Sequence, residues 1–113
     1  MCIAVADESG NLIAFERMDG AKILSVGLSA DKAFTAAISK RPTHEYNEIC
    51  QPGNLANGIH TSSGGQFSIV DGGFPVVIRN TVVGAIGLSG GAVEQDMECA
   101  EAAVRGILGA KGV

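Results

Sequence analysis

The sequence contains two histidines, His44 and His60, and neither has a partner at metal-ligand spacing. A zinc site needs ligands at short fixed spacings such as HxH or HExxH, so we expect no metal site. A single imidazole is nevertheless enough to bind haem iron, provided that an apolar slot lies beside it. A structural or solvent-exposed histidine is the alternative at each position. Both residues are therefore candidates for a haem ligand rather than for a metal cluster.

A glycine-rich stretch at residues 87–94 leads into a predicted helix. Backbone N–H groups at a helix N-terminus can bind an anion, which makes Ser89, Gly90 and Gly91 a candidate anion-binding loop. The spacing matches neither a Walker loop nor GxGxxG. Acidic residues at 94 and 96 would also repel a phosphate in the first turn. A simple strand-to-helix connection with positive φ angles is the alternative.

The adjacent cations Lys40 and Arg41 follow a predicted helix and precede Thr43. They could bind a carboxylate or a propionate group, since the guanidinium of arginine suits paired oxygens. Alternatively, they simply complement the helix dipole at its C-terminal end. The two interpretations are compatible with one another.

Catalytic nucleophiles and acids receive little support from the sequence. Ser89 lies in a Gly-Leu-Ser-Gly-Gly run that looks like a hydrolase elbow, but no histidine follows it to act as the base. Four acidic residues of the last helix are predicted to form a solvated face, or alternatively to collect a divalent cation or iron at the surface. They are Glu94, Asp96, Glu98 and Glu101.

Length and composition predict one soluble domain spanning residues 1–113. The net charge of −4 argues against nucleic acid as a partner, because phosphate binding needs a basic face. No apolar run reaches the length of a membrane span and no secretory leader is visible, so we expect a cytoplasmic protein that does not enter a membrane. The three cysteines are odd in number and unpaired in pattern, so we expect small apolar residues.

Hydrophobic patterning predicts strands at 2–6, 12–17, 66–70, 74–78 and 82–88. Helices are expected at about 21–39, with 29 as an alternative start, at 45–50 and at 92–108. This order predicts an α+β fold with about five antiparallel strands and helices packed on one face. The other face would then be covered by a second subunit. Glycines 84 and 87 within a strand indicate a bulge or a close approach by another backbone.

Several segments together resemble the GlcG/HbpS-like family. Residues 4–21 resemble its opening hairpin, and residues 31–43 resemble its "K-A-x-T-A … R-P-T" helix. Residues 72–75 resemble its Gly-Gly-x-Pro block, and residues 82–96 its V-G-A-I-G-V-S-G … E-Q-D block. Residues 58–65 are similar to the branch that includes the C-terminal domain of PduO-type corrinoid adenosyltransferases.

The resemblance implies a profilin-like fold with a five-stranded sheet, assembled into dimers and in many members octamers. It also implies haem or related tetrapyrrole binding. In this chain the candidate residues for that group are His60, His44, Arg41, Thr43, Gly72 and Gly73. Family members usually carry a helix before the first strand, whereas this sequence begins almost on the strand, so we expect that helix to be absent.

We therefore expect a homo-oligomeric haem- or tetrapyrrole-binding accessory protein. One alternative is an enzyme acting on a small carboxylate, with Lys40, Arg41 and the Gly90-Gly91 loop binding the acid group. The other is an oligomer with a purely structural role.

Overall fold

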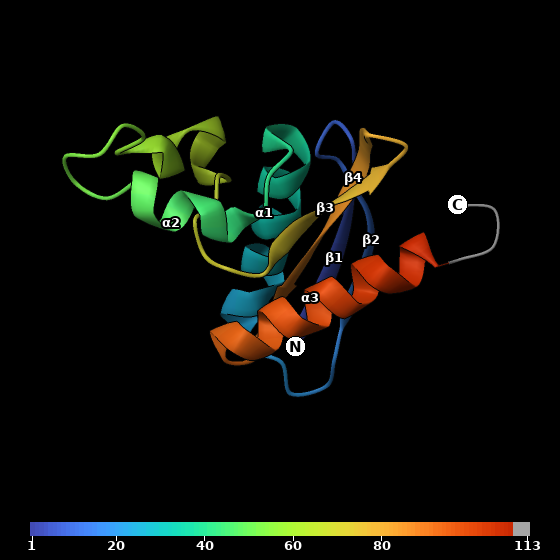
Figure 1. The fold of residues 1–113 in the computed structure, drawn as a ribbon. Coiled ribbons are helices and arrows are strands. Elements are labelled where there is room, and N and C mark those ends of the chain that lie inside the picture. The colour runs from blue at the N-terminus through green and yellow to red at the C-terminus, as the bar shows by residue number, and fades with distance from the viewer. Residues whose placement is uncertain (110–113) are drawn as a thin grey trace.

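The computed structural model describes residues 1–109 and contains one antiparallel sheet (Figure 1). Strands β1 (Cys2–Asp7) and β2 (Leu12–Arg17) form the first hairpin, and β3 (Gly73–Ile78) and β4 (Thr81–Ser89) form the second. Because β1 also pairs antiparallel with β4, the strand order is β2-β1-β4-β3. The α+β class and both hairpins are confirmed, but the sheet has four strands rather than five.

The predicted strand at 66–70 was wrong. Its backbone groups bond to helix α1 and to local side chains instead of to a neighbouring strand. The Ser68 N–H donates to Thr35 Oγ1 at 2.7 Å, and the Thr35 hydroxyl donates to the Gln66 carbonyl at 3.2 Å. With these groups occupied, the segment runs along α1 as irregular chain.

Three helices accompany the sheet: α1 (Ile23–Ser39), the short α2 (Tyr46–Ile49) and α3 (Val93–Leu108). Single 3₁₀ turns occur at Thr43–Glu45, Ile59–Thr61 and Ser63–Gly65. The first helix begins well before residue 29, so the later alternative start was wrong. No helix within residues 1–109 is long and apolar enough to cross a membrane.

The expectation that the helices share one face of the sheet was also wrong. Alternate residues of β1 and β4 point to opposite sides, because the side-chain period of a strand is two. Ala4 and Ala85 pack with α1, whereas Ile86 and Leu88 pack with Ala100 of α3. Figure 1 shows α3 crossing the side of the sheet that α1 does not cover.

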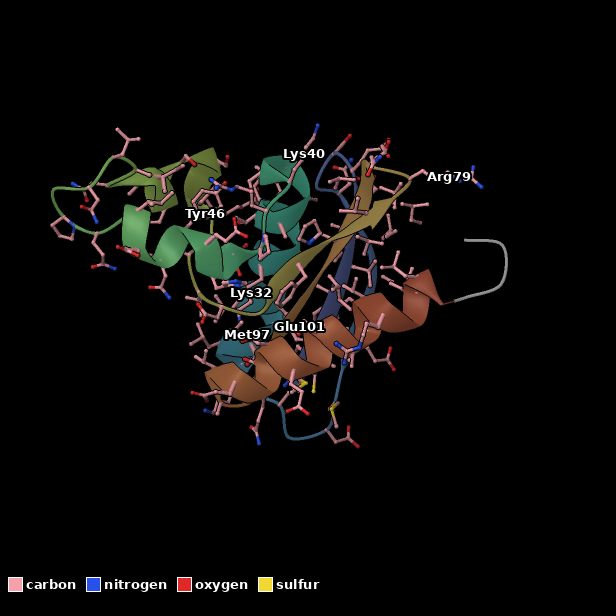
Figure 2. All side chains as sticks on the ribbon, viewed as in Figure 1. Lys32, Lys40, Tyr46, Arg79, Met97 and Glu101 are labelled. Carbon is pink, nitrogen blue, oxygen red and sulfur yellow. The ribbon has the colours of Figure 1, made fainter. Side chains whose placement is uncertain are left out.

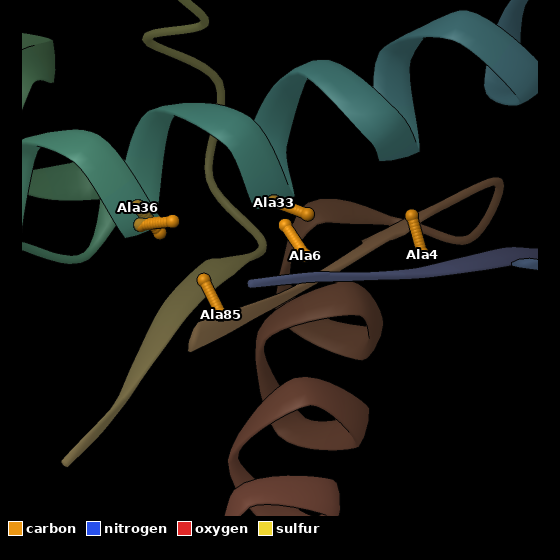
Figure 3. Packing of buried hydrophobic residues seen from close by; sticks show 6 residues of the cluster. Ala4, Ala6, Ala33, Ala36 and Ala85 are labelled. Carbon is orange, nitrogen blue, oxygen red and sulfur yellow. The ribbon is translucent and has the colours of Figure 1, made fainter. Parts of the chain in front are cut away.

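Small residues bring α1 unusually close to the sheet. The buried cluster on this side consists of alanines alone, as Figure 3 shows: Ala4, Ala6, Ala33, Ala36, Ala37 and Ala85. A Cβ atom on Gly87 would overlap the Ser29 carbonyl oxygen of α1, and one on Gly84 would overlap the Ala6 carbonyl oxygen. The predicted close backbone approach at these two glycines is therefore confirmed.

The cysteines are free. Cys2 and Cys50 are buried, in agreement with the sequence, whereas Cys99 lies on the exposed face of α3. Cys99 therefore departs from the burial that is common for free cysteines, on which the prediction of small apolar residues rested.

Candidate functional site

Lys32 of α1 is the largest fully buried side chain, with 1 % of its surface exposed. Its ammonium donates to the Leu88 carbonyl oxygen at 2.7 Å and lies 3.5 Å from Asp96 Oδ2. The two ionic partners come from helices on opposite faces of the sheet, and they meet where β4 ends. A buried ion pair of this kind costs desolvation energy, so its presence calls for a reason beyond stability.

Glycines make room for the lysine side chain. A Cβ atom at Gly72 would lie 3.0 Å from Lys32 Nζ, and one at Gly87 would lie 3.0 Å from Lys32 Cβ. At Gly73 a Cβ atom would lie 2.6 Å from the Lys32 carbonyl oxygen and 2.7 Å from Thr43 Cγ2. Gly72, just before β3, and Gly87 of β4 thus leave room for the Lys32 side chain, while Gly73 lets the start of β3 approach the Lys32 backbone.

Burial lowers the pKa of Lys32 below its ordinary value, because the charged form loses its hydration. The carboxylates of Asp96 and Asp71 act in the opposite direction, since they favour the ammonium form. Desolvation is the larger effect. Lys32 therefore gives up its proton more readily than an exposed lysine.

A cavity of about 180 Å³ adjoins this ion pair, between the first half of α1 and the turn from β4 to α3. Its polar lining comes from Lys22, Ser25, Lys32, Ser89, Gly90, Gly91 and Asp96. Its apolar lining comes from Leu24, Leu28, Val70 and Val93. The Ser89 hydroxyl lies 3.5 Å from the Ser25 hydroxyl on the cavity wall. The site is therefore small, partly apolar and furnished with hydroxyl and ammonium groups.

The predicted anion-binding loop, Ser89, Gly90 and Gly91, lies on the wall of this cavity. However, the Gly91 N–H donates to Asp96 Oδ1 at 3.0 Å, and the Ala92 N–H donates to Gln95 Oε1 at 2.9 Å. Side chains of α3 thus already cap the start of their own helix. Anion binding by the loop stays a prediction, and an anion there would need donors other than these two.

The prediction that Asp96 belongs to a solvated helix face was wrong, since only 4 % of Asp96 is exposed. Neighbouring Glu94, Glu98 and Glu101 are exposed, as the sequence indicated. Asp96 differs because α3 turns it inward toward Gly91 and Lys32. Among residues 1–109, no group of three or more His, Cys, Asp or Glu side chains is placed to hold a metal ion.

Lys40 and Arg41 lie at the other end of α1, far from the glycine-rich loop. Ser25 contacts Ser89, and fifteen residues of helix separate Ser25 from Lys40, which corresponds to about 22 Å. Figure 2 shows Lys40 at the end of α1 remote from Lys32. The carboxylate site that joined Lys40 and Arg41 to Gly90-Gly91 is therefore not assembled within one copy of the chain.

Arg41 has two neighbours of its own. Its Nε donates to Glu45 Oε1 at 3.1 Å, and its guanidinium carbon lies 5.6 Å from the centre of the Tyr46 ring. Both ionic side chains are about half exposed. The guanidinium thus lies at the surface, where it contacts the Tyr46 ring and forms an exposed ion pair with the Glu45 carboxylate.

His44 is half-buried in the turn that follows α1, and its ring lies 5.6 Å from the ring of Phe74. Its Nδ1 atom is enclosed and has no hydrogen-bond partner among the described residues. Next to it, the buried Thr43 hydroxyl accepts a hydrogen bond from the Gly73 N–H at 3.0 Å. Thr43 therefore fastens this turn to the start of β3.

His60 lies in a different environment from His44. It is exposed, in the single turn Ile59–Thr61 of the segment between α2 and β3. Leu55 of the same segment is fully exposed. The structure thus places one candidate histidine against an aromatic ring and leaves the other in solvent.

The sequence analysis missed Ser25, Lys32 and Asp96 as one site. A signal was present in α1, because Ser25, Ser29 and Lys32 recur at helical spacing on the side that also carries Ala33 and Ala36. All five are buried. When polar and apolar residues share one buried face of a helix, the polar residues are expected to pack against other buried polar groups.

Comparison with known proteins gives a consistent result. The family model described as "Haem degrading protein HbpS-like" matches residues 1–105. An uncharacterised 15.0 kDa protein from the dhaT-dhaS intergenic region of Citrobacter freundii is 40 % identical over 89 % of this chain and 71 % of its own length.

Two solved structures are also close. Protein ORFY of Klebsiella pneumoniae has a TM-score of 0.95 and 35 % identity, and the match covers 97 % of this chain and 76 % of that one. A PduOC:haem complex has a TM-score of 0.89 and 33 % identity, over 92 % of this chain and 75 % of that one. The fold is thus shared with these proteins.

Proposed function

Because this chain belongs to the haem degrading protein HbpS-like family, as its GlcG/HbpS-like motifs indicated, we propose that it binds haem or a related tetrapyrrole as an accessory protein. The PduOC:haem complex supports the choice of ligand, since that relative shares the fold. The observation within this chain that carries the proposal is the half-buried imidazole of His44 against Phe74.

The ligand has to lie on the surface or between copies of the chain rather than in the cavity beside Lys32. Pockets that enclose drug-sized ligands measure about 300–1,000 Å³, and this cavity measures about 180 Å³. A flat macrocycle needs an apolar surface with one ligand atom, and the region of His44 offers both. Phe74 supplies an aromatic ring on the edge strand β3, which has an unpaired side.

His44 is the residue that would hold the haem iron. With Nδ1 enclosed, Nε2 is the nitrogen that remains to meet a group arriving from outside. When haem is bound, its iron supplies the redox or oxygen chemistry, while the imidazole holds and orients it. His60 is the second candidate, because its exposure leaves both nitrogens accessible but provides no apolar slot.

In this proposal Arg41 binds a propionate. Its guanidinium already holds the Glu45 carboxylate at the surface, and a propionate can replace that partner with little change in geometry. Thr43, Gly72 and Gly73 support the site from behind. Thr43 fixes the turn that carries His44, and the two glycines lie over the buried lysine instead of on the surface.

The proposal includes self-association into dimers or octamers in the cytoplasm. The edge strand β2 exposes Leu12 and Ile13 to 53 % and 63 %, and the start of α1 exposes Ile23 to 83 %. A second copy of the chain would remove this apolar surface from water. Light scattering at micromolar concentration should give at least the dimer mass, and a monomer would contradict this part of the proposal.

A haemin titration followed by the Soret band tests ligand binding. The wild type should give a shifted band that saturates at a fixed stoichiometry. His44→Ala should lose that shift or weaken the affinity by at least tenfold, whereas His60→Ala should retain it. A wild-type spectrum that stays that of free haemin would reject haem binding, and loss of the shift in His60→Ala alone would move the ligand to His60.

A further inference from the structure

The cavity between the first half of α1 and the β4–α3 turn contains groups that haem binding leaves unused. Its walls bring together two lysines, one aspartate and two serines from three separate parts of the chain. Lys32, Ser25, Ser89 and Asp96 are all buried. Clusters of buried, differently charged groups beside a cavity mark candidate binding sites, because burying them is costly unless they serve a purpose.

The Lys32 ammonium has more hydrogen-bond donors than it has acceptors among the described residues. An ammonium group has three N–H donors. Within residues 1–109, Nζ meets the Leu88 carbonyl at 2.7 Å and, more weakly, Asp96 at 3.5 Å. One donor is left without a protein acceptor, and Lys32 is one of the residues that line the cavity.

The charges around the cavity favour an anion with a single charge. Lys22 and Lys32 carry two positive charges and Asp96 carries one negative charge, so the lining has a net charge of +1. A monoanion would neutralise this lining, whereas a dianion such as a phosphate monoester would leave one uncompensated negative charge beside the buried Asp96. The hydroxyls of Ser25 and Ser89, 3.5 Å apart, add neutral hydrogen-bonding groups beside the ammonium.

The volume and apolar walls limit the rest of the ligand. A cavity of about 150 Å³ holds a molecule of the size of benzene, so about 180 Å³ holds a ligand of similar size or slightly larger. Leu24, Leu28, Val70 and Val93 would contact a short hydrocarbon chain. A nucleotide or a tetrapyrrole would extend out of the pocket into solvent instead of being held within it.

We propose that this cavity is a binding site for a small monocarboxylate with a short aliphatic chain, and that Lys32, Ser25 and Ser89 bind the carboxylate. Lys22 lies at the same cavity and adds positive charge, while the leucine and valine side chains contact the aliphatic part. This site differs from the one first expected at Lys40 and Arg41, and it is independent of haem binding at His44.

The lowered pKa of Lys32 agrees with this assignment. Desolvation disfavours the charged ammonium form of Lys32. An anion in the cavity would favour that form, as Asp96 and Asp71 already do. Binding should therefore weaken as the pH rises through the pKa of Lys32. The charged groups that face the ammonium are Asp96 from α3 and Asp71 from the segment before β3.

Propionate is a suitable probe, and propionamide is its uncharged counterpart of the same shape. In ¹H–¹⁵N spectra of the wild type, propionate should shift the amide signals of Ser89, Gly90 and Gly91 with a dissociation constant of about 1 mM, the scale expected for a few heavy atoms. Propionamide should bind at least tenfold more weakly. Inorganic phosphate should also bind more weakly than propionate.

Two variants locate the site. Ser25→Leu should fill the cavity and weaken propionate at least tenfold, while Lys40→Ala on the same helix should leave its affinity unchanged. Equal binding of propionate and propionamide to the wild type, or the absence of shifts at Ser89–Gly91, would overturn the proposal without any variant. Loss of binding in Lys40→Ala but not in Ser25→Leu would overturn it in favour of the other end of α1.

Discussion

The two ends of α1 hold two regions of opposite character. Toward its N-terminal end, the buried side chains of Ser25 and Lys32 line a small pocket, and Lys32 pairs there with the buried Asp96 of α3. Beyond its C-terminal end, Arg41 and His44 lie at the surface beside the aromatic rings of Tyr46 and Phe74. The first region suits a small anion and the second a large flat ligand. The two proposed sites would thus lie at opposite ends of one helix and differ in size and polarity.

The difference arises from backbone features at each end. Gly72 and Gly87 leave the space through which Lys32 reaches Leu88 and Asp96. At the other end, Lys40 adopts a left-handed conformation with φ of 59° and Pro42 is extended, so the chain leaves the helix and turns outward. Close packing therefore encloses the Lys32–Asp96 ion pair, and we call this end of α1 the enclosed region. The helix stop leaves Arg41 and His44 at the surface, and we call that end the open region.

The largest expected effect comes from removing the buried cation. Lys32→Met should lower the free energy of unfolding by roughly 3–5 kcal/mol, because Asp96 would remain buried without its ionic partner. The double variant Lys32→Met/Asp96→Leu should recover most of that loss, since no uncompensated charge remains. Urea unfolding measures both. A single variant as stable as the wild type would show that the ion pair is not the centre of the enclosed region.

Close packing at Gly87 is the next feature to test. Gly87→Ala should cost about 1–3 kcal/mol, because its Cβ atom would overlap the Ser29 carbonyl of α1. Gly27→Ala is the matched control, since nothing lies within 4 Å of its added Cβ, and it should stabilise the helix by about 0.5–1 kcal/mol. Thermal unfolding compares the two. Equal effects would mean that α1 does not approach β4 as closely as described.

The pH dependence of stability should reflect Lys32. Because burial lowers its folded-state pKa, the unfolded chain binds more protons between that pKa and 10.5, and the free energy of unfolding should rise with pH across this interval. Below the interval both states are protonated, so Lys32 contributes no slope. Urea unfolding of the wild type and of Lys32→Met/Asp96→Leu at several pH values isolates the contribution. A slope that the double variant retains unchanged would assign it to other groups.

The smallest effect on stability is expected at the open end of α1. Arg41→Ala should change the free energy of unfolding by only about 0–1 kcal/mol, because the pair with Glu45 is exposed. Its haemin affinity should nevertheless fall several-fold, through loss of a propionate partner. If Arg41→Ala lost much stability but bound haemin as the wild type does, Arg41 would be a structural residue and not a ligand contact.

The open region was largely visible in the sequence, whereas the enclosed one was not. Arg41 and His44 are close in sequence to a helix stop, so their proximity follows from local rules. Gly84 and Gly87 also predicted a close approach by another backbone. The structure confirms it, with the Ala6 carbonyl next to Gly84 and the Ser29 carbonyl next to Gly87. Both features can be predicted from the local sequence. The first depends only on residues that are neighbours in the chain, and the second depends only on the absence of a side chain at a glycine.

Lys32 and Asp96 are 64 residues apart, and their pairing depends on which face of the sheet each helix covers. That arrangement was predicted wrongly, so the pair could not be found. The spacing of the acidic residues in α3 is typical of a solvated helix face. Asp96 differs from Glu94 only because its side chain points inward, where it accepts a hydrogen bond from the Gly91 N–H. The same dependence on tertiary packing explains the missing strand at 66–70, whose backbone bonds to Thr35.

The central claim is that the haem-type ligand binds at the open end of α1 and not at the enclosed one. A haemin titration of His44→Ala and Ser25→Leu, followed at the Soret band, tests it most directly. We predict that Ser25→Leu binds haemin as the wild type does, while His44→Ala loses the shifted band or binds at least tenfold more weakly. Retention of the shifted band in His44→Ala together with its loss in Ser25→Leu would contradict the account.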